Sequence, residues 1–489
     1  MSELVAGVDS STQSTKVVVV DPDDGSVVAT GHAPHPVEGT GGARETDPAA
    51  WVGALALALE QTGRAADVGA VSVGGQQHGL VVMDGQGLPL RPAPLWHDTR
   101  SAQDAAALVG ALGGPQVWAE RMGVLPVASF TISKWAWLRR VEPDVAAATR
   151  QVCLPHDWLI RALTGTAATD RGDASGTGWW SGHDERYAAD VLDLPAVRLD
   201  AGMLPRVLGP GEAAGTVRSS RPKAGSAFER GSLGGLPEGC LVGPGTGDNM
   251  GAALGLAVDV GTPVMSLGTS GTVFAVADRC PADASGTVAG FADATGRFLP
   301  LACTLNATTA VDRVAGWLGL DRDAVEPGGE VVVLPYLDGE RTPNLPLAAG
   351  TIAGLRHETT PGQILRAAYE GAVASLLTAL DVFTALGVGP APDAPVVLVG
   401  GGARGRAWQD TVRRLSGRAV VVPRLQEAVA YGAAAQAAAV LTGEAPHAVA
   451  KRWGGSAGTV LEPLPRDDAA LQRLDSVRSA AAGLLGLGR

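Results

Sequence analysis

Residues 4–20 read LVAGVDSSTQSTKVVVV and contain an apolar run, a polar turn and a second apolar run. The apolar runs at residues 4–8 and 16–20 predict two strands, and the turn residues between them predict a hairpin. A third strand is expected at residues 26–30, after another turn-rich segment. The chain is therefore expected to begin with a small antiparallel sheet.

A helix and a further strand follow this sheet. Pro48 lies in the first turn of a helix expected from Asp47 to about Gln61, and residues 68–73 predict a strand that ends in Gly74-Gly75. The second half of the chain repeats this order. Its expected strands are residues 263–267, 272–276, 396–399 and 418–422, and its expected helices are residues 405–415 and 428–441. Two such halves predict a duplicated α/β fold with a mostly parallel sheet in each half.

Two large domains are expected, because 489 residues exceed a single comfortable core. We place the domains at residues 1–243 and 244–489, where turn residues precede the second strand system. Residues 209–239 are rich in Gly, Pro, Ser and charge, and we expect them to form a surface excursion. Residues 467–485 predict a last helix that packs on one domain.

Composition excludes several classes of protein. A net charge of −12 argues against a broad nucleic-acid surface and against an anionic membrane surface. The four cysteines are widely spaced and form no CxxC pair, so neither a disulfide framework nor a zinc site is expected. No basic and apolar leader precedes Asp9, and the least polar stretch, residues 429–443, is too short to span a bilayer. These features favour a cytoplasmic protein.

Two polar turns occupy matching places in the two halves. Residues 9–15 combine the Asp9 carboxylate with five hydroxyls that include Ser11 and Thr12, and Gly268-Thr269-Ser270-Gly271 adds glycines and two further hydroxyls. Such turns can direct N–H and O–H donors at phosphate oxygens, and Asp9 can hold Mg²⁺ directly or through water. Each turn alone could equally be a hydrophilic hairpin. Their matched placement favours phosphate binding, although neither turn is a Walker-type loop.

Asp248 lies in the sharpest single feature, residues 245–251, which read GTGDNMG. Flanking glycines let the backbone turn abruptly and let a substrate approach closely. A carboxylate at such a strand end can accept a hydroxyl proton while the oxygen attacks phosphorus. The alternative is that the Asp248-Asn249 pair caps the helix that follows it.

Three further segments could line a polar pocket or a nucleotide site. Gln77 and His78 stand between glycines at the end of a strand, although a lone His is more often structural. Trp96 and Asp98 could meet a sugar face and its hydroxyls, or Trp96 could be core while Asp98 pairs with Arg100. Residues 400–404 read GGGAR at a strand end, where Gly401, Gly402 and Ala403 would let a flat adenosine lie against the backbone.

Together these segments resemble the FGGY carbohydrate kinases, and within that family the xylulose kinases. The resemblance spans nearly the whole chain in the expected order. Its motifs are DSST from Asp9, QQHG from Gln76, LWHDTR from Leu95, Lys134, LPHDW from Leu154, GTGDN from Gly245, SLGTSG from Ser266, LPYLDGERTP from Leu334 and GGGAR from Gly400. It implies two actin-like, ribonuclease-H-like domains with ATP–Mg²⁺ and a sugar in the cleft between them, and phosphorylation of D-xylulose to D-xylulose 5-phosphate.

The resemblance also implies roles for individual residues. Asp248 is similar to the general base, the pair Gln77-His78 to a substrate contact, and Asp9 to the metal ligand. The remaining expected site residues are Trp96, Asp98 and Asn249 for the substrate, and Ser11, Thr12, Gly268, Thr269, Ser270, Gly401, Gly402 and Ala403 for ATP. Dimers are common in the family, which makes a homodimer an expectation.

Two departures leave alternatives open. Ser10 and Ser11 stand where many xylulose kinases have Leu-Gly, and Gln77 stands where many have Met. A more polar contact at Gln77 keeps open a kinase of the same family that acts on another ketose or polyol, such as ribulose or an alditol. An actin-like ATPase without a sugar substrate is a further alternative from a different class, and the carboxylate turn at Asp248 argues against it.

Overall fold

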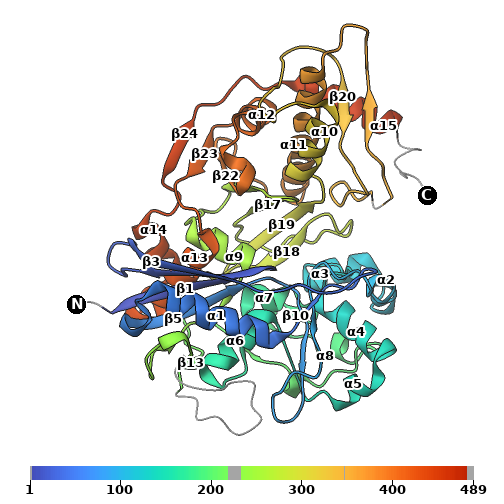
Figure 1. The fold of residues 1–489 in the computed structure, drawn as a ribbon. Coiled ribbons are helices and arrows are strands. Elements are labelled where there is room, and N and C mark those ends of the chain that lie inside the picture. Colours follow the sequence, from blue (N-terminus) through green and yellow to red (C-terminus); the bar gives the residue numbers. More distant parts are fainter. Residues whose placement is uncertain (1–2, 219–232, 346, 482–489) are drawn as a thin grey trace. The chain divides into compact units, whose positions relative to one another are not determined.

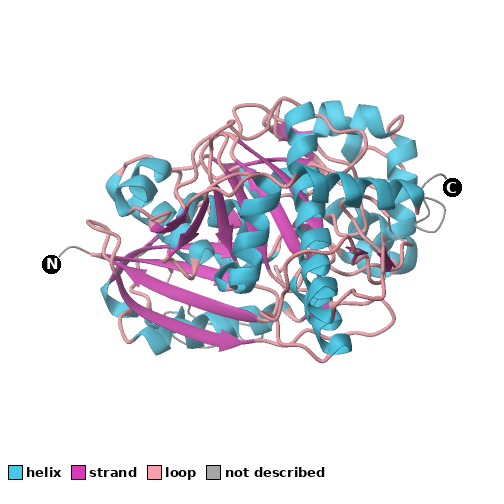
Figure 2. Cartoon of the chain, turned by 90° about the horizontal axis from the view of Figure 1, so that it is seen from above, coloured by secondary structure: helices cyan, strands magenta, loops and turns pink. Residues whose placement is uncertain are grey.

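The computed structural model describes residues 3–218, 233–345 and 347–481. The chain forms two compact units that each mix helices with strands (Figure 2). Unit 1 comprises residues 1–258, 290–299 and 425–455, and unit 2 comprises residues 259–289, 300–424 and 456–489.

Unit 1 is built on a seven-stranded sheet in the order β13-β14-β5-β1-β2-β3, with β15 also paired to β5. The strands of this sheet are β1 (Leu4–Ser10), β2 (Ser14–Val20), β3 (Val27–Pro34), β5 (Val68–Gly75), β13 (Gly215–Thr216), β14 (Leu241–Val242) and β15 (Thr246–Gly247). β1 is antiparallel to β2 and parallel to β5, so the hairpin predicted from the first residues is confirmed.

Short strand pairs and helices complete unit 1. The pairs are β4 (Glu45–Thr46) with β7 (Ala93–Pro94), β6 (Val81–Met83) with β8 (Gln151–Cys153), β9 (Ala168–Asp170) with β12 (Arg206–Leu208), and β10 (Trp180–Ser181) with β11 (Arg186–Tyr187). The helices are α1 (Pro48–Thr62), α2 (Ala102–Ala111), α3 (Pro115–Met122), α4 (Thr131–Val141), α5 (Pro143–Ala148), α6 (Pro155–Thr164), α7 (Arg171–Ser175), α8 (Ala189–Leu192), α9 (Asp248–Gly255), α13 (Ala428–Thr442) and α14 (Pro446–Trp453).

Helices cover both faces of the unit 1 sheet. α1 begins where the Asp47 side chain accepts a hydrogen bond from the N–H of Ala49, and it ends at Gly63 in the left-handed conformation. The indole of Trp51, on α1, is fully buried in the core between this helix and the sheet. On the other face α13 packs so closely on β1 that a Cβ at Gly7 would lie 1.8 Å from the carbonyl oxygen of Ala430. Glycine at position 7 is therefore a packing requirement.

Unit 2 contains most of a second seven-stranded sheet, in the order β18-β19-β17-β16-β22-β23-β24, and only residues 290–299 of this sheet segment, at β18 and the start of β19, are grouped with unit 1. Its strands are β16 (Pro263–Leu267), β17 (Gly271–Ala275), β18 (Ala289–Ala292), β19 (Phe298–Thr304), β22 (Val396–Val399), β23 (Val420–Pro423) and β24 (Gly458–Leu461), beside the pair β20 (Val332–Leu334) and β21 (Thr351–Ala353). Its helices are α10 (Thr308–Leu318), α11 (Pro361–Ala385), α12 (Arg406–Ser416) and α15 (Asp468–Ala480). The core of this unit combines the sheet with helices α10, α11 and α12, and within it Tyr369 of α11 packs against Trp408 of α12 at 4.8 Å between ring centroids.

The compact units divide the chain differently from the expected domains 1–243 and 244–489. The first change of unit comes after Val258, and α13 and α14 belong to unit 1 although they follow the strands of unit 2. Figure 1 shows these two helices, in red, beside the blue strands of unit 1. The physical reason is the tight packing of α13 on β1 and α9, which the repeat in the sequence does not reveal.

Two further expectations fall only partly on the described residues. Of residues 209–239, only 209–218 and 233–239 lie in the described part, and Gly215–Thr216 there forms an edge strand of the sheet while Leu236 is fully buried. This segment is therefore more than the expected surface excursion. The expected helix at residues 467–485 is α15, which ends at Ala480, and its last expected residues lie outside the described part. Among the described residues, no helix is long and apolar enough to cross a membrane.

Candidate active site

The polar residues of unit 1 meet at one edge of its sheet. In the register of β1 and β5, Asp9 lies opposite Gly74 and Ser10 lies opposite Gly75. β15 pairs with the same two glycines, which places Gly247 at this edge and starts α9 at Asp248. Parallel strands end at the same edge of a sheet, so three segments that are distant in sequence converge here.

The Asp248 carboxylate is half-buried and held by its neighbour Asn249. Asp248 Oδ1 accepts hydrogen bonds from the backbone N–H of Asn249 at 2.7 Å and from Asn249 Nδ2 at 2.8 Å. Asn249 Nδ2 also donates to Gln77 Oε1 at 3.0 Å. Burial, and after it the negative charge of Asp9, raise the pKa of Asp248 to about 7. A carboxylate with this pKa is about half ionised at neutral pH, and its ionised form is basic enough to take a proton.

Asp248 is the first helical residue of α9, and Gly247 occupies the N-cap position. Asp248 Oδ1 accepts a hydrogen bond from the N–H of Asn249, in the first turn of α9. The alternative interpretation of Asp248 as a helix cap is therefore supported by this one hydrogen bond, although the N-cap position itself belongs to Gly247.

Asp9 lies at the end of β1 and is 6% exposed. Burial raises its pKa to about 6, while the Ser11 side chain and the Lys16 charge lower it. Lys16 in turn pairs with Glu427 at 2.7 Å. Asp9 Oδ1 is buried and has no hydrogen-bond partner among the described residues. An unpartnered carboxylate oxygen fits a Mg²⁺ ion, which proteins often hold by one or two carboxylates together with substrate phosphates and water.

His78 has a positive φ of 67° and is fixed from several sides. Its Nδ1 lies 2.9 Å from the carbonyl oxygen of Gly176, and its ring stacks on Phe130 at 4.6 Å between centroids. Lys134 Nζ donates to the carbonyl oxygen of His78 at 3.2 Å. Burial lowers the pKa of Lys134 to about 7, against the opposing charge of Asp98. The strained backbone and these contacts orient the His78 ring, as a binding residue requires.

A buried acidic cluster beneath Gln77 and His78 was not among the expected site residues. His156 Nδ1 lies 2.9 Å from Asp173 Oδ2, and His156 Nε2 lies 3.1 Å from Asp157 Oδ1 and 3.5 Å from Asp170 Oδ1. Burial raises the pKa of Asp173 to about 8, although the Gln77 side chain and the His78 backbone lower it. The charge of Asp173 also raises the pKa of Asp248. The LPHDW motif was the only signal in the sequence for this cluster.

Trp96 and Asp98 lie close in sequence but have different surroundings: Trp96 contacts the first polar turn, and Asp98 pairs with Arg100. Trp96 is 41% exposed, and its Nε1 donates to Thr12 Oγ1 at 3.0 Å, so the indole lies beside the first polar turn. Asp98 is 2% exposed and accepts from the backbone N–H of Arg44 at 2.9 Å and from Arg100 Nη2 at 2.6 Å. Burial raises the pKa of Asp98 and these hydrogen bonds lower it more, so the net shift is downward. The ion pair with Arg100 engages both oxygens of Asp98, and its contact with substrate stays a prediction.

The nucleotide residues expected in unit 2 also lie together. Gly268, Thr269 and Ser270 form the turn between β16 and β17, and the carbonyl oxygen of Gly268 accepts from Thr308 Oγ1 at 2.7 Å. β22 is parallel to β16, with Val399 opposite Ser266, so residues 400–403 follow the same sheet edge. Gly400 has a φ of 88° and a Cβ there would lie 2.7 Å from the carbonyl oxygen of Leu267, whereas a Cβ at Gly401 would meet nothing within 4 Å. The open surface at Gly401 suits a flat group laid against the backbone.

Among the described residues, no group of three or more His, Cys, Asp or Glu side chains is placed to hold a metal ion. A metal in unit 1 would therefore depend on Asp9 together with the oxygens of a bound substrate. All four cysteines, Cys153, Cys240, Cys280 and Cys303, are free thiols.

Comparison with known proteins gives a consistent result. Residues 4–255 match the family model for the N-terminal domain of the FGGY family of carbohydrate kinases, and residues 264–441 match that for its C-terminal domain. The chain is 60% identical to a xylulose kinase of Streptomyces rubiginosus and 59% identical to one of Streptomyces coelicolor, in both cases over 99% of this chain and 98% and 97% of the relatives. The crystal structure of xylulose kinase from Bifidobacterium adolescentis matches with a TM-score of 0.83 and 37% identity, covering 97% of this chain and 99% of that one.

Proposed function

Because this chain belongs to the FGGY family of carbohydrate kinases, we propose that it transfers the terminal phosphoryl group of ATP to D-xylulose, giving D-xylulose 5-phosphate and ADP. The relatives named xylulose kinases, which align with almost all of this chain, support D-xylulose as the acceptor. The observation that carries the chemistry is the Asp248 carboxylate, which Asn249 holds at the sheet edge beside Gln77.

In this proposal Asp248 accepts the proton of the attacking sugar hydroxyl. Its pKa of about 7 lets it take the proton as the oxygen bonds to phosphorus. Asn249 fixes the direction of the carboxylate, and Gln77 and His78 contact the sugar hydroxyls. Gln77 Oε1 accepts a hydrogen bond from Asn249 Nδ2 at 3.0 Å, which places the Gln77 side chain beside Asp248.

Asp9, Ser11 and Thr12 would bind the phosphate end of ATP from unit 1. Mg²⁺, where bound at Asp9 Oδ1, would neutralise charge on the phosphate oxygens. Unit 2 would bind the rest of the nucleotide. Residues 268–270 supply hydroxyl and backbone donors for phosphates, and residues 401–403 supply the flat backbone surface for adenosine. Trp96 lines the sugar site beside Thr12.

We also place the protein in the cytoplasm, as a homodimer that binds no nucleic acid or membrane. The four free thiols and the net charge of −12 support this placement. Size-exclusion chromatography with light scattering tests the dimer directly.

The test of the proposed function is an ADP-release assay with Mg-ATP and a panel of D-xylulose, D-ribulose, L-ribulose, glycerol and xylitol. We expect turnover that depends on sugar and is highest with D-xylulose. Preference for another ketose would retain the kinase and change its substrate, and ATP hydrolysis that ignores every sugar would contradict the proposal.

The variant Asp248→Ala tests the role of the base. We expect kcat to fall by about 10²–10⁴-fold, because a positioned general base contributes that much, while the ATP affinity measured by calorimetry changes little. Asp193→Ala, at an exposed position in the same unit, is the matched control and should retain full activity. Substantial sugar phosphorylation by Asp248→Ala would remove Asp248 from this role.

A further inference from the structure

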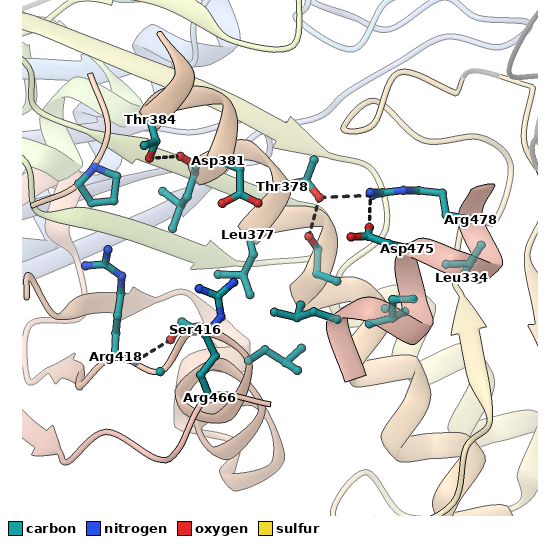
Figure 3. Close-up of a pocket in the computed structure, with 18 of the residues that line it drawn as sticks. Leu334, Leu377, Thr378, Asp381, Thr384, Ser416, Arg418, Arg466, Asp475 and Arg478 are labelled. Atoms are coloured by element: carbon teal, nitrogen blue, oxygen red, sulfur yellow. Dashed lines mark hydrogen bonds and ion pairs between the residues drawn. The ribbon is translucent and has the colours of Figure 1, made fainter. Parts of the chain in front are cut away.

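Unit 2 contains a cavity of about 360 Å³ that the proposed reaction does not use. It lies between α11, α15 and the segment that joins α12 to β23 (Figure 3). A volume of this size falls within the range of small-molecule sites in proteins.

The cavity and the expected nucleotide turns occupy opposite edges of the same sheet. Residues 268–270 and 400–403 follow the carboxyl ends of the parallel strands β16 and β22. Pro390 and Pro392 of the cavity precede β22, and Arg418 precedes β23, which is parallel to β22. β22 alone spans about 13 Å, from its four residues at about 3.3 Å each. A ligand in the cavity would therefore not occupy the nucleotide turns.

Two arginines in the cavity wall, Arg418 and Arg466, have N–H groups that make no hydrogen bond within the described part of the chain. Arg418 uses only Nη1, which donates to the carbonyl oxygens of Ala391 and Ala394, both at 2.8 Å. Arg466 Nε lies 3.0 Å from Asp468 Oδ1 at an exposed position. Within the described part of the chain, Nε and Nη2 of Arg418 and both Nη atoms of Arg466 have no hydrogen-bond acceptor.

The two guanidinium groups also repel each other. Burial lowers the pKa of Arg418, the charge of Asp393 raises it, and the charge of Arg466 lowers it by a smaller amount. An anion between two such groups would relieve their repulsion and receive charge-assisted hydrogen bonds from both. This end of the cavity is therefore suited to a phosphate.

The helix α11 presents a different surface to the same cavity. Thr378, Asp381 and Thr384 project from it, and Figure 3 shows Asp381 facing the side from which Arg418 and Arg466 rise. Burial raises the pKa of Asp381, and the charge of Arg466 lowers it, so this carboxylate lies within electrostatic range of the arginine. A carboxylate between two threonines can accept and exchange hydrogen bonds with several hydroxyls, which suits a polyol.

Charge and shape narrow the class of ligand. Arg478 is already paired with Asp475, and the lining as a whole holds three arginines against two aspartates, too little excess charge for a bisphosphate. The one aromatic side chain in the lining, Tyr336, is 2% exposed and offers no face on which a nucleobase could stack. We propose that this cavity is a second binding site, separate from the reaction centre, for a sugar monophosphate whose phosphate lies between Arg418 and Arg466 and whose hydroxyls meet Asp381.

Isothermal titration of the full chain with D-xylulose 5-phosphate, in saturating D-xylulose and ADP, tests the site. We expect binding that Arg466→Gln and Arg418→Gln each weaken at least tenfold, because each removes charged hydrogen bonds to the phosphate. Arg356→Gln, an exposed arginine of the same unit, is the matched control and should bind as the wild type does. Equal affinity in Arg466→Gln, whose exposed position makes misfolding no concern, would overturn the proposal.

A second variant tests the sugar part of the assignment. Asp381→Leu should weaken the binding of D-xylulose 5-phosphate more than that of inorganic phosphate, because only the sugar phosphate has hydroxyls that bond to the Asp381 carboxylate. The difference between the two affinities should therefore become smaller. Inorganic phosphate or AMP binding to the wild type as tightly as the sugar phosphate would overturn the ligand class. Turnover by Arg418→Gln and Arg466→Gln at saturating substrate should remain that of the wild type, and this readout separates the cavity from the proposed reaction.

Discussion

At the scale of single residues, the candidate site is a group of carboxylates whose pKa values are raised by burial. The pKa of Asp248 is about 7, that of Asp9 about 6 and that of Asp173 about 8. Because these groups interact, their titration belongs to the group rather than to any one residue. The protonation of this group is therefore expected to govern activity near neutral pH.

We predict that kcat/KM for D-xylulose falls as the pH drops through about 7, since the base must be ionised to accept a proton. The sign follows from the carboxylate: protonation below its pKa removes the acceptor. The pH profile at saturating Mg-ATP measures this acid limb. A rate that stays constant from pH 8 to pH 5.5 would contradict Asp248 as the base.

The variant Asp173→Asn tests the coupling between the buried cluster and the base. The pKa of Asp173 is about 8, so Asp173 is mostly protonated in the range where Asp248 titrates, and its replacement removes only a small part of the negative charge that raises the pKa of Asp248. We therefore expect the acid limb of the pH profile to shift to lower pH by only a small amount. Asp190→Asn, an exposed residue paired with Arg121, is the control and should leave the limb in place.

The site residues show what sequence can and cannot predict at this scale. Asp9, Gln77 and Asp248 could be predicted to meet, because each follows a strand and parallel strands end at one edge of a sheet. The contact between His156 and Asp173 could not be predicted, since the hydrogen bond joins residues 17 apart that follow no shared period. For Asp98 the sequence left two interpretations open, a contact with sugar hydroxyls or an ion pair with Arg100. Only the side-chain geometry shows the ion pair.

At the scale of elements, α9 owes its position to small residues. A Cβ at Gly432 of α13 would lie 1.9 Å from the carbonyl oxygen of Gly251, and one at Gly255 would lie 2.1 Å from that of Ala428. The two helices therefore touch backbone to backbone. Since α9 begins at Asp248, this contact sets the position of Asp248, the proposed base.

Gly432→Ala should displace α9 and affect both stability and activity. We expect a loss of about 1–3 kcal/mol in the free energy of unfolding, as for other overpacked cores. A drop in kcat of about ten- to a hundredfold should accompany it, because small displacements of catalytic groups are costly. Urea denaturation and steady-state kinetics measure the two effects.

The control for that variant is Gly53→Ala on α1, where an added Cβ would meet nothing within 4 Å. It should stabilise the protein by about 0.5–1 kcal/mol, since alanine is the better helix former, and leave kcat unchanged. If both variants behaved alike, the contact between α9 and α13 would have no special role.

The elements themselves were largely predictable. The strand at residues 263–267 is β16, and the helix expected at 428–441 is α13, ending at Thr442. Apolar runs bounded by turn residues carry that information locally. The elements that pack against α13 were not predictable. The helix is rich in alanine and has no distinct polar face, so its sequence does not indicate which side contacts the sheet.

At the scale of the whole molecule, two units divide the expected tasks. Hydrogen exchange should show this division, because a ligand slows exchange where it orders the backbone. We predict that D-xylulose alone protects residues 74–79 and 246–250 of unit 1. A non-hydrolysable ATP analogue should protect residues 268–271 and 400–404 of unit 2. Protection of residues 400–404 by the sugar alone would contradict this assignment.

The packing of α13 in unit 1 has a consequence for folding during synthesis on the ribosome. β1 is made first, yet the helix that covers its Gly7 face comes from residues 425–455, near the end of the chain. At about 5–20 residues per second, roughly ten to forty seconds of translation separate residue 258 from residue 455. Throughout that interval the nascent chain carries an open apolar sheet face. Chaperones that shield such faces, and pauses in translation after residue 258, would therefore influence the yield of folded enzyme.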